Sequence, residues 1–115
     1  MKDIYLGLDV GGTKCSVVIG DSSLTVKRKV VFDTLTERGH QAILYEFRQH
    51  MKSLLADYPD HKLKRIGMSC GGPLDSKKGI VYSPPNLPGW NNVPVTSIFS
   101  DEFFQIVFRR IFKKI

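Results

Sequence analysis

The stretch of residues 4–14 constrains the fold of this chain more than any other part of the sequence. An apolar run, Ile4-Tyr5-Leu6-Gly7-Leu8, leads to an acidic residue, and two glycines then precede a second apolar run at residues 15–20. Apolar, β-favouring runs on both sides of a Gly-Gly turn are typical of a β-hairpin. The sequence therefore predicts a hairpin with a polar tip that carries Asp9.

The tip of this predicted hairpin has the composition of a phosphate site. Gly11 and Gly12 lack a Cβ and permit positive φ, so that a large anion can approach successive backbone N–H groups. Thr13 adds a hydroxyl group and Lys14 adds a positive charge. Asp9 would repel phosphate directly, but a divalent cation on its carboxylate would bridge to phosphate. Gly-Gly is also an ordinary hairpin turn, and the neighbouring acid, hydroxyl and cation favour the phosphate interpretation.

Composition and charge exclude several classes of protein. With 115 residues, 42% of them hydrophobic and 24% charged, the chain fits one globular domain with one core. The first apolar run is too short to span a bilayer, so we expect a cytoplasmic protein that does not contact a membrane. The net charge of +6 is divided among separate basic clusters without a helix-turn-helix or stacking motif, so nucleic-acid binding is not expected. Cys15 and Cys70 lie in apolar runs, which favours core positions over disulfide or metal ligation.

Downstream of the hairpin, the hydrophobic pattern predicts a strand, then a helix, then another strand. Residues 24–32 predict a third strand. The residues expected on one face of this strand are Val26, Val30 and Phe32. Residues 38–58 carry apolar side chains at helical spacing and predict an amphipathic helix that packs on the sheet. Residues 65–70 form a short apolar run after that helix, as expected of a buried strand parallel to the first.

Two later loops are candidates for ligand contacts. Because ligands of α/β sheets bind outside the carboxyl ends of parallel strands, Gly71 and Gly72 are expected at the same sheet edge as Asp9. Residues 83–90 include three prolines, which make a stiff loop around Asn86. The amide of Asn86 both donates and accepts hydrogen bonds, as a sugar hydroxyl requires. The alternative is that Asn86 only forms a turn and that the two glycines do the same.

Three motifs together resemble the ROK family of bacterial sugar kinases and related repressors. In chain order they are Asp9-Val10-Gly11-Gly12-Thr13-Lys14, Gly67-Met68-Ser69-Cys70-Gly71-Gly72-Pro73-Leu74-Asp75 and Ser83-Pro84-Pro85-Asn86-Leu87-Pro88-Gly89-Trp90. The first is similar to the phosphate-binding motif of the wider sugar kinase, actin and Hsp70 superfamily. The resemblance implies an α/β fold: a single ribonuclease-H-like N-terminal lobe over residues 1–115, with a mixed sheet and flanking helices.

The resemblance also implies an activity and a set of site residues. ROK kinases transfer a phosphoryl group from ATP to a hydroxyl group of a hexose or an N-acetylhexosamine. The implied nucleotide contacts are Asp9, Gly11, Gly12, Thr13 and Lys14, and Asp9 is also the implied Mg²⁺ ligand. The implied sugar contacts are Gly71, Gly72 and Asn86.

The resemblance covers about the first hundred residues. ROK kinases continue into a strand that ends in an Asn-Asp pair, whose aspartate is the general base, and nothing in this sequence matches that pair. The family's zinc motif, second phosphate loop and adenosine pocket are also unmatched. We therefore expect the N-terminal lobe of a sugar kinase, truncated before the catalytic base, without a catalytic residue and inactive alone, with an atypical tail over residues 105–115.

The end of the chain leaves alternatives open. Residues 96–115 predict a helix with one apolar and one basic face, which packs on its own domain or on a partner. A homo-oligomer through this helix and a non-catalytic binding module are therefore alternatives to a kinase lobe. A fragment of a sugar-responsive ROK repressor is a third alternative, but the residues before Asp9 leave no room for the winged helix-turn-helix of such repressors.

Overall fold

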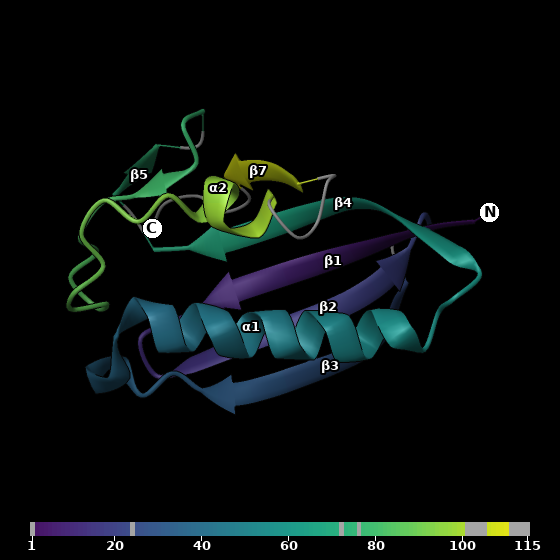
Figure 1. Cartoon of the computed structure of the whole chain (residues 1–115), viewed down its shortest axis with the longest axis horizontal. Coiled ribbons are helices and arrows are strands. Elements are labelled where there is room, and N and C mark those ends of the chain that lie inside the picture. The colour runs from purple at the N-terminus through teal and green to yellow at the C-terminus, as the bar shows by residue number, and fades with distance from the viewer. Residues whose placement is uncertain (1, 24, 72, 76, 101–105, 111–115) are drawn as a thin grey trace.

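We describe the following residues of the chain in a computed structural model: 2–23, 25–71, 73–75, 77–100 and 106–110. A mixed five-stranded sheet in the order β3-β2-β1-β4-β7 forms the centre (Figure 1). Its strands are β1 (Lys2–Val10), β2 (Lys14–Asp21), β3 (Val26–Asp33), β4 (His61–Cys70) and β7 (Ile106–Arg110). The remaining elements are η1 (Thr36–Arg38), α1 (Gly39–Ala56), β5 (Leu74–Asp75), β6 (Ile80–Val81) and α2 (Val95–Ser100).

The directions of the strands follow the sequence prediction. β1, β2 and β3 pair antiparallel, so the predicted hairpin and third strand are confirmed. β4 is parallel to β1 after the α1 crossover, and β7 is parallel to β4. Because β1 and β4 run in the same direction and stay in register up to Val10 and Cys70, their carboxyl ends lie at one edge of the sheet.

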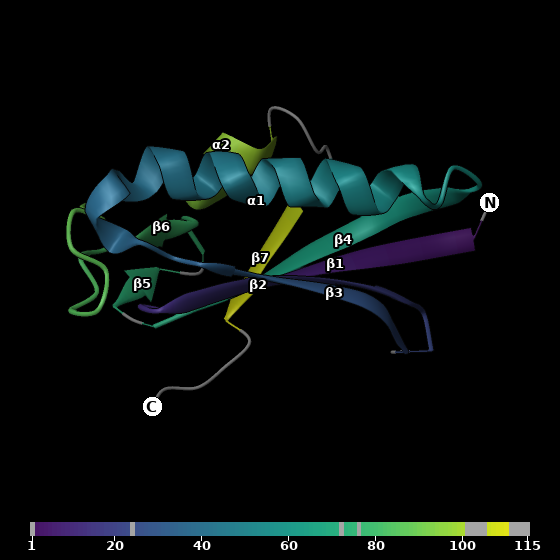
Figure 2. The ribbon, with the colours of Figure 1, turned by 90° about the horizontal axis from the view of Figure 1, so that it is seen from below.

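The core lies between the sheet and α1. Alternate residues of β1 (Ile4, Leu6, Leu8 and Val10) and of β2 (Cys15, Val17 and Ile19) are buried. The buried residues of α1 are Ile43, Leu44, Phe47, Met51 and Leu54, which recur at the helical spacing that the sequence predicted. Both α1 and α2 lie on the same side of the sheet (Figure 2). Among the described residues, no helix is long and apolar enough to cross a membrane.

The third strand differs from the prediction at its beginning. The register between β2 and β3 shifts at Ile19 and Gly20, so that Gly20 pairs with Val26 and Ile19 pairs with Arg28. A bulge of this kind adds one residue and reverses the face of every side chain beyond it. Val26 is therefore 58% exposed instead of sharing the inner face of Val30 and Phe32. Arg28 instead follows the inner face, where its guanidinium forms an ion pair with Asp57.

Of the predicted helix over residues 96–115, the part at 96–100 is helical and the part at 106–110 is not. α2 ends at Ser100, and residues 106–110 form the strand β7. The apolar run Ile106-Val107-Phe108 satisfies both a helical face and a buried strand, because short apolar runs fit either period. β4 offers an unpaired parallel edge at this place, and pairing with it satisfies the backbone of the run. Residues 101–105 and 111–115 of the predicted helix lie outside the described residues.

The proline-rich loop is anchored by its own apolar residues. Trp90 is completely buried, and Leu87 is 1% exposed. The backbone N–H of Ser83 donates a hydrogen bond to the Trp90 carbonyl oxygen at 2.7 Å, which closes the loop at its base. Trp90 is therefore a core residue, and the loop holds the exposed Asn86 at its outer side.

Candidate functional site

The hairpin tip and the loop after β4 meet at the carboxyl edge of the central strands. Gly11 and Gly12 follow β1 directly, and Gly71 follows β4 directly. The in-register pairing of Val10 with Cys70 places both loops side by side, as the sequence predicted. Gly72 lies outside the described residues.

Asn86 joins these two loops. A Cβ added to Gly12 would lie 3.0 Å from the Asn86 carbonyl oxygen and 3.1 Å from the Asn86 Cβ. A Cβ added to Gly71 would lie 3.6 Å from the Asn86 side-chain oxygen. The predicted phosphate loop therefore forms one continuous surface with Gly71 and Asn86, the two residues of the predicted sugar site that the structure describes. Gly12 favours this close approach, because a Cβ at this position would be tightly packed against Asn86, which would have to shift by a few tenths of an ångström.

Asp9 is exposed at the end of β1, on the face opposite to the buried Leu8 and Val10. Its partners on the neighbouring strands are Ser16 and Ser69, which share its face. Within the described part of the chain, no group of three or more His, Cys, Asp or Glu side chains could hold a metal. One accessible carboxylate flanked by hydroxyls suits Mg²⁺, which takes one or two carboxylates and keeps waters and substrate phosphates as its other ligands.

Thr13 and Lys14 are exposed at the hairpin tip. The Lys14 ammonium forms an ion pair with Asp33, and both side chains are about 60% exposed (62% and 59%). Exposed pairs of this kind contribute about 0 to 1 kcal/mol, so the pairing leaves Lys14 free to turn toward an anion. Lys14 is therefore a cation beside the loop rather than a fixed ligand.

Thr34 holds the hairpin tip from β3, and sequence reasoning missed it. Its backbone N–H donates to the Thr13 carbonyl oxygen at 2.9 Å, and its hydroxyl donates to the Gly11 carbonyl oxygen at 2.8 Å. The Cys15 sulfur lies 3.2 Å from the same hydroxyl oxygen. No sequence signal identifies Thr34, because only the pairing of β2 with β3 brings it to the turn.

The two cysteines beside the site are neutral thiols. Burial raises the pKa of Cys15, and burial together with the negative charge of Asp9 raises the pKa of Cys70 to about 12. Both residues are buried and free of disulfides. They flank Val10 on its two neighbouring strands and act as small core residues, as the sequence predicted.

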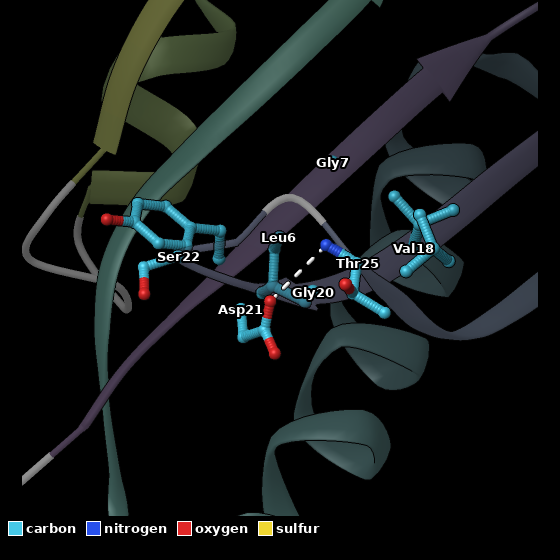
Figure 3. Close-up of a pocket in the computed structure, with 9 residues that line it drawn as sticks. Leu6, Gly7, Val18, Gly20, Asp21, Ser22 and Thr25 are labelled. Carbon is cyan, nitrogen blue, oxygen red and sulfur yellow. Dashed lines mark hydrogen bonds between the residues drawn. The ribbon is translucent and has the colours of Figure 1, made fainter.

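A separate groove lies on the open face of the sheet, at the other end of the hairpin (Figure 3). It has a volume of about 400 Å³, and its lining includes Gly7, Val18, Gly20 and Thr25. The glycines leave this space because they carry no side chain above the sheet. Asp21 closes its rim by accepting a hydrogen bond from the Thr25 N–H at 3.3 Å. The groove belongs to the β2–β3 turn and not to the Gly11-Gly12 tip.

Comparisons with known proteins agree with the fold. The sequence profile of the ROK family matches residues 5–109. The chain is 33% identical to the glucokinase of Thermotoga maritima over 91 residues, which are 79% of this chain and 28% of that protein. The ROK hexokinase of Thermus thermophilus superposes with a TM-score of 0.76 and 25% identity, covering 93% of this chain and 35% of that one. A ROK family glucokinase from Streptomyces griseus, solved with glucose and AMPPNP, superposes with a TM-score of 0.71 and 19% identity, over 93% of this chain and 33% of that one.

The mixed sheet, its α1 crossover and the glycine hairpin at its carboxyl edge define an α/β lobe of the actin and Hsp70 type. The chain belongs to the ROK family. It has the fold of the N-terminal lobe of ROK sugar kinases, and it spans 28% of the length of the Thermotoga glucokinase.

Proposed function

We propose that this chain is the N-terminal lobe of an ATP-dependent ROK sugar kinase that acts on a hexose or an N-acetylhexosamine. The closeness of Asn86 to both Gly12 and Gly71 supports this proposal most directly. Phosphoryl transfer depends on positioning the donor phosphate beside the acceptor hydroxyl group. A phosphate loop that touches a sugar loop within one lobe provides that proximity.

In this proposal, each side of the contact has a role. The N–H groups of the Gly11-Gly12 turn and the Thr13 hydroxyl bind the phosphates of ATP, and Lys14 leaves Asp33 to neutralise their charge. Asp9 holds Mg²⁺, which when bound neutralises charge on the phosphate oxygens. On the other side, the sugar hydroxyls are bound by Gly71, Gly72 and Asn86.

We further propose that the chain alone does not turn over and that it acts in the cytoplasm. In ROK kinases the general base is the aspartate of an Asn-Asp pair, and this sequence does not match that pair. General-base catalysis contributes a factor of about 10² to 10⁴, and the chain spans only 28% of the Thermotoga relative. The lobe therefore supplies binding and positioning but no catalytic residue.

Isothermal titration calorimetry with MgATP and with glucose tests this function. We expect the wild-type chain to bind MgATP, and Asp9→Asn to weaken that binding by about tenfold or more, because a charged ligand to the metal is lost. Asp3→Asn is the matched control, because Asp3 lies at the opposite end of the same strand. A wild-type chain that does not bind MgATP contradicts the proposal, whether or not it binds glucose.

The alternative functions have less support. The oligomerising module depended on a long apolar helix face, and residues 106–110 form a strand instead. A ROK repressor fragment would bind the sugar without MgATP. The same calorimetry separates that alternative from the kinase lobe, and size-exclusion chromatography separates a monomer from an assembly.

A further inference from the structure

Thr34 is the one polar side chain among the described residues that is completely buried. It follows β3 and lies under the hairpin tip, where its hydroxyl and its backbone N–H each hold one carbonyl oxygen of the turn. The hydroxyl donates to Gly11, and the N–H donates to Thr13. Two hydrogen bonds from one buried residue therefore fix both ends of the Gly11–Thr13 segment.

The bond to Gly11 also sets the direction of the next N–H group. In a trans peptide the carbonyl and the N–H point in opposite directions within one plane. Because the Gly11 carbonyl points inward to Thr34, the Gly12 N–H points outward from the turn. Among the described residues, the Gly12 N–H has no acceptor. It is therefore an oriented donor at the place where an anion would lie.

We propose that Thr34 is a positioning residue for nucleotide phosphate: it holds the Gly11–Gly12 peptide so that the Gly12 N–H faces the bound phosphate. This inference rests on the proposed function of the hairpin tip. Thr34 itself does not touch the nucleotide. Glycine is the most flexible residue in the backbone, so ordering a glycine turn costs conformational entropy. Because Thr34 already orders the turn in the free protein, nucleotide binding does not have to supply that cost.

Neighbouring residues support this role. The Thr34 hydroxyl gives its proton to Gly11, and the Cys15 thiol is a second donor beside it, with its sulfur 3.2 Å from the Thr34 oxygen and 4.0 Å from the Gly11 carbonyl oxygen. Burial keeps the Cys15 thiol protonated by raising its pKa, so this donor persists at neutral pH. Arg38 donates from Nε to the Thr34 carbonyl oxygen at 2.9 Å and pairs with Glu46 of α1 at 2.8 Å. Through Arg38, Thr34 is therefore connected by hydrogen bonds and an ion pair to the first half of α1.

Three variants of the full chain test the inference. Thr34→Val removes the hydroxyl at nearly constant volume, Thr34→Ser retains it, and Thr25→Val makes the same chemical change in the turn at the other end of the hairpin. We expect Thr34→Val to weaken MgATP binding about 3- to 10-fold, the effect of one lost hydrogen bond. Thr34→Ser should restore binding to within about twofold, and Thr25→Val should leave it unchanged.

A second measurement separates positioning from general loss of structure. The NMR shifts of the Gly11 carbonyl carbon and the Gly12 amide should change in Thr34→Val, while those of the α1 core residues do not. If Thr34→Val does not fold, Cys15→Ala removes the weaker sulfur donor beside Thr34 and the Gly11 carbonyl oxygen and should shift the same two resonances by less.

The outcomes distinguish the inference from the proposed function. Wild-type chain that binds no MgATP overturns the proposed function, and the phosphate role of Thr34 falls with it. Wild-type chain that binds MgATP, with Thr34→Val binding equally well or with unchanged Gly11 and Gly12 resonances, overturns the inference alone.

Discussion

At the scale of single residues, the glycines of the site are present for different reasons. Gly12 is packed against Asn86 so closely that a Cβ would lie 3.0 Å from a backbone oxygen. Gly71 has room, because the nearest atoms to its Cβ position are side-chain atoms of Asn86 at 3.6 Å and 3.8 Å. The contact between the two loops therefore depends on Gly12 more than on Gly71.

This difference predicts the behaviour of two matched variants. Gly12→Ala should lower the free energy of unfolding by about 1 to 3 kcal/mol, because overpacking displaces the Asn86 loop. Gly71→Ala should change it by less than about 0.5 kcal/mol. Urea unfolding followed by circular dichroism measures both. Equal losses in the two variants would contradict the packing of Asn86 against Gly12.

Cys70 predicts a pH dependence of stability. Its pKa is about 12 in the folded chain and about 8.5 when unfolded. The folded state therefore holds the thiol proton more tightly, so stability is full below about pH 8.5 and is lost as pH rises toward 12. Between pH 9 and 10.5, the free energy of unfolding should fall by about 1 kcal/mol per pH unit more in the wild type than in Cys70→Ala. Urea unfolding at each pH checks this, and parallel curves for the two proteins would refute it.

At the scale of elements, α1 packs against one face of the sheet and supplies a large part of the core. Phe47 is fully buried on its inner face and meets the Phe32 ring edge-on at 5.0 Å between centroids. Tyr45 lies on the same helix and is 57% exposed. Both residues are aromatic, so they form a matched pair that differs in burial.

Truncation of this pair should therefore give different results. Phe47→Ala should destabilise the chain by about 3 to 5 kcal/mol, because a large side chain leaves a cavity between α1 and β3. Tyr45→Ala should have an effect within about 0.5 kcal/mol. Thermal unfolding followed by circular dichroism measures the difference. A similar loss in both variants would mean that α1 does not pack on the sheet by this face.

At the scale of the whole molecule, the proposed function separates binding from chemistry. The carboxyl edge collects the hairpin tip, Gly71 and Asn86 in one place, whereas β7 ends in two arginines. On the proposed function, this lobe binds substrates and does not convert them, because its sequence does not match the Asn-Asp pair that supplies the base in ROK kinases.

A coupled assay for ADP release with glucose and ATP tests this prediction. We expect turnover at least 10²-fold below that of a complete ROK kinase assayed in parallel, because the proposal assigns no general base to this chain. Asp9→Asn is the control that identifies activity from a contaminating enzyme, since it should not change a background rate. Turnover at the rate of the complete kinase, abolished in Asp9→Asn, would show that a base lies within this chain.

The sequence by itself determined the hairpin at Gly11 and Gly12, the amphipathic helix that became α1 and the parallel strand that became β4. These elements have strong periodicity, and local propensity and packing agree for them. It also placed Asp9 and Gly71 at one edge, because parallel strands carry their loops on the same side. Three features were decided only by the tertiary structure. A bulge in the β2–β3 ladder turned Val26 outward, the free edge of β4 made residues 106–110 a strand, and pairing across the sheet brought Thr34 under the hairpin tip. Each depends on a partner distant in the chain, and a local pattern does not contain that partner.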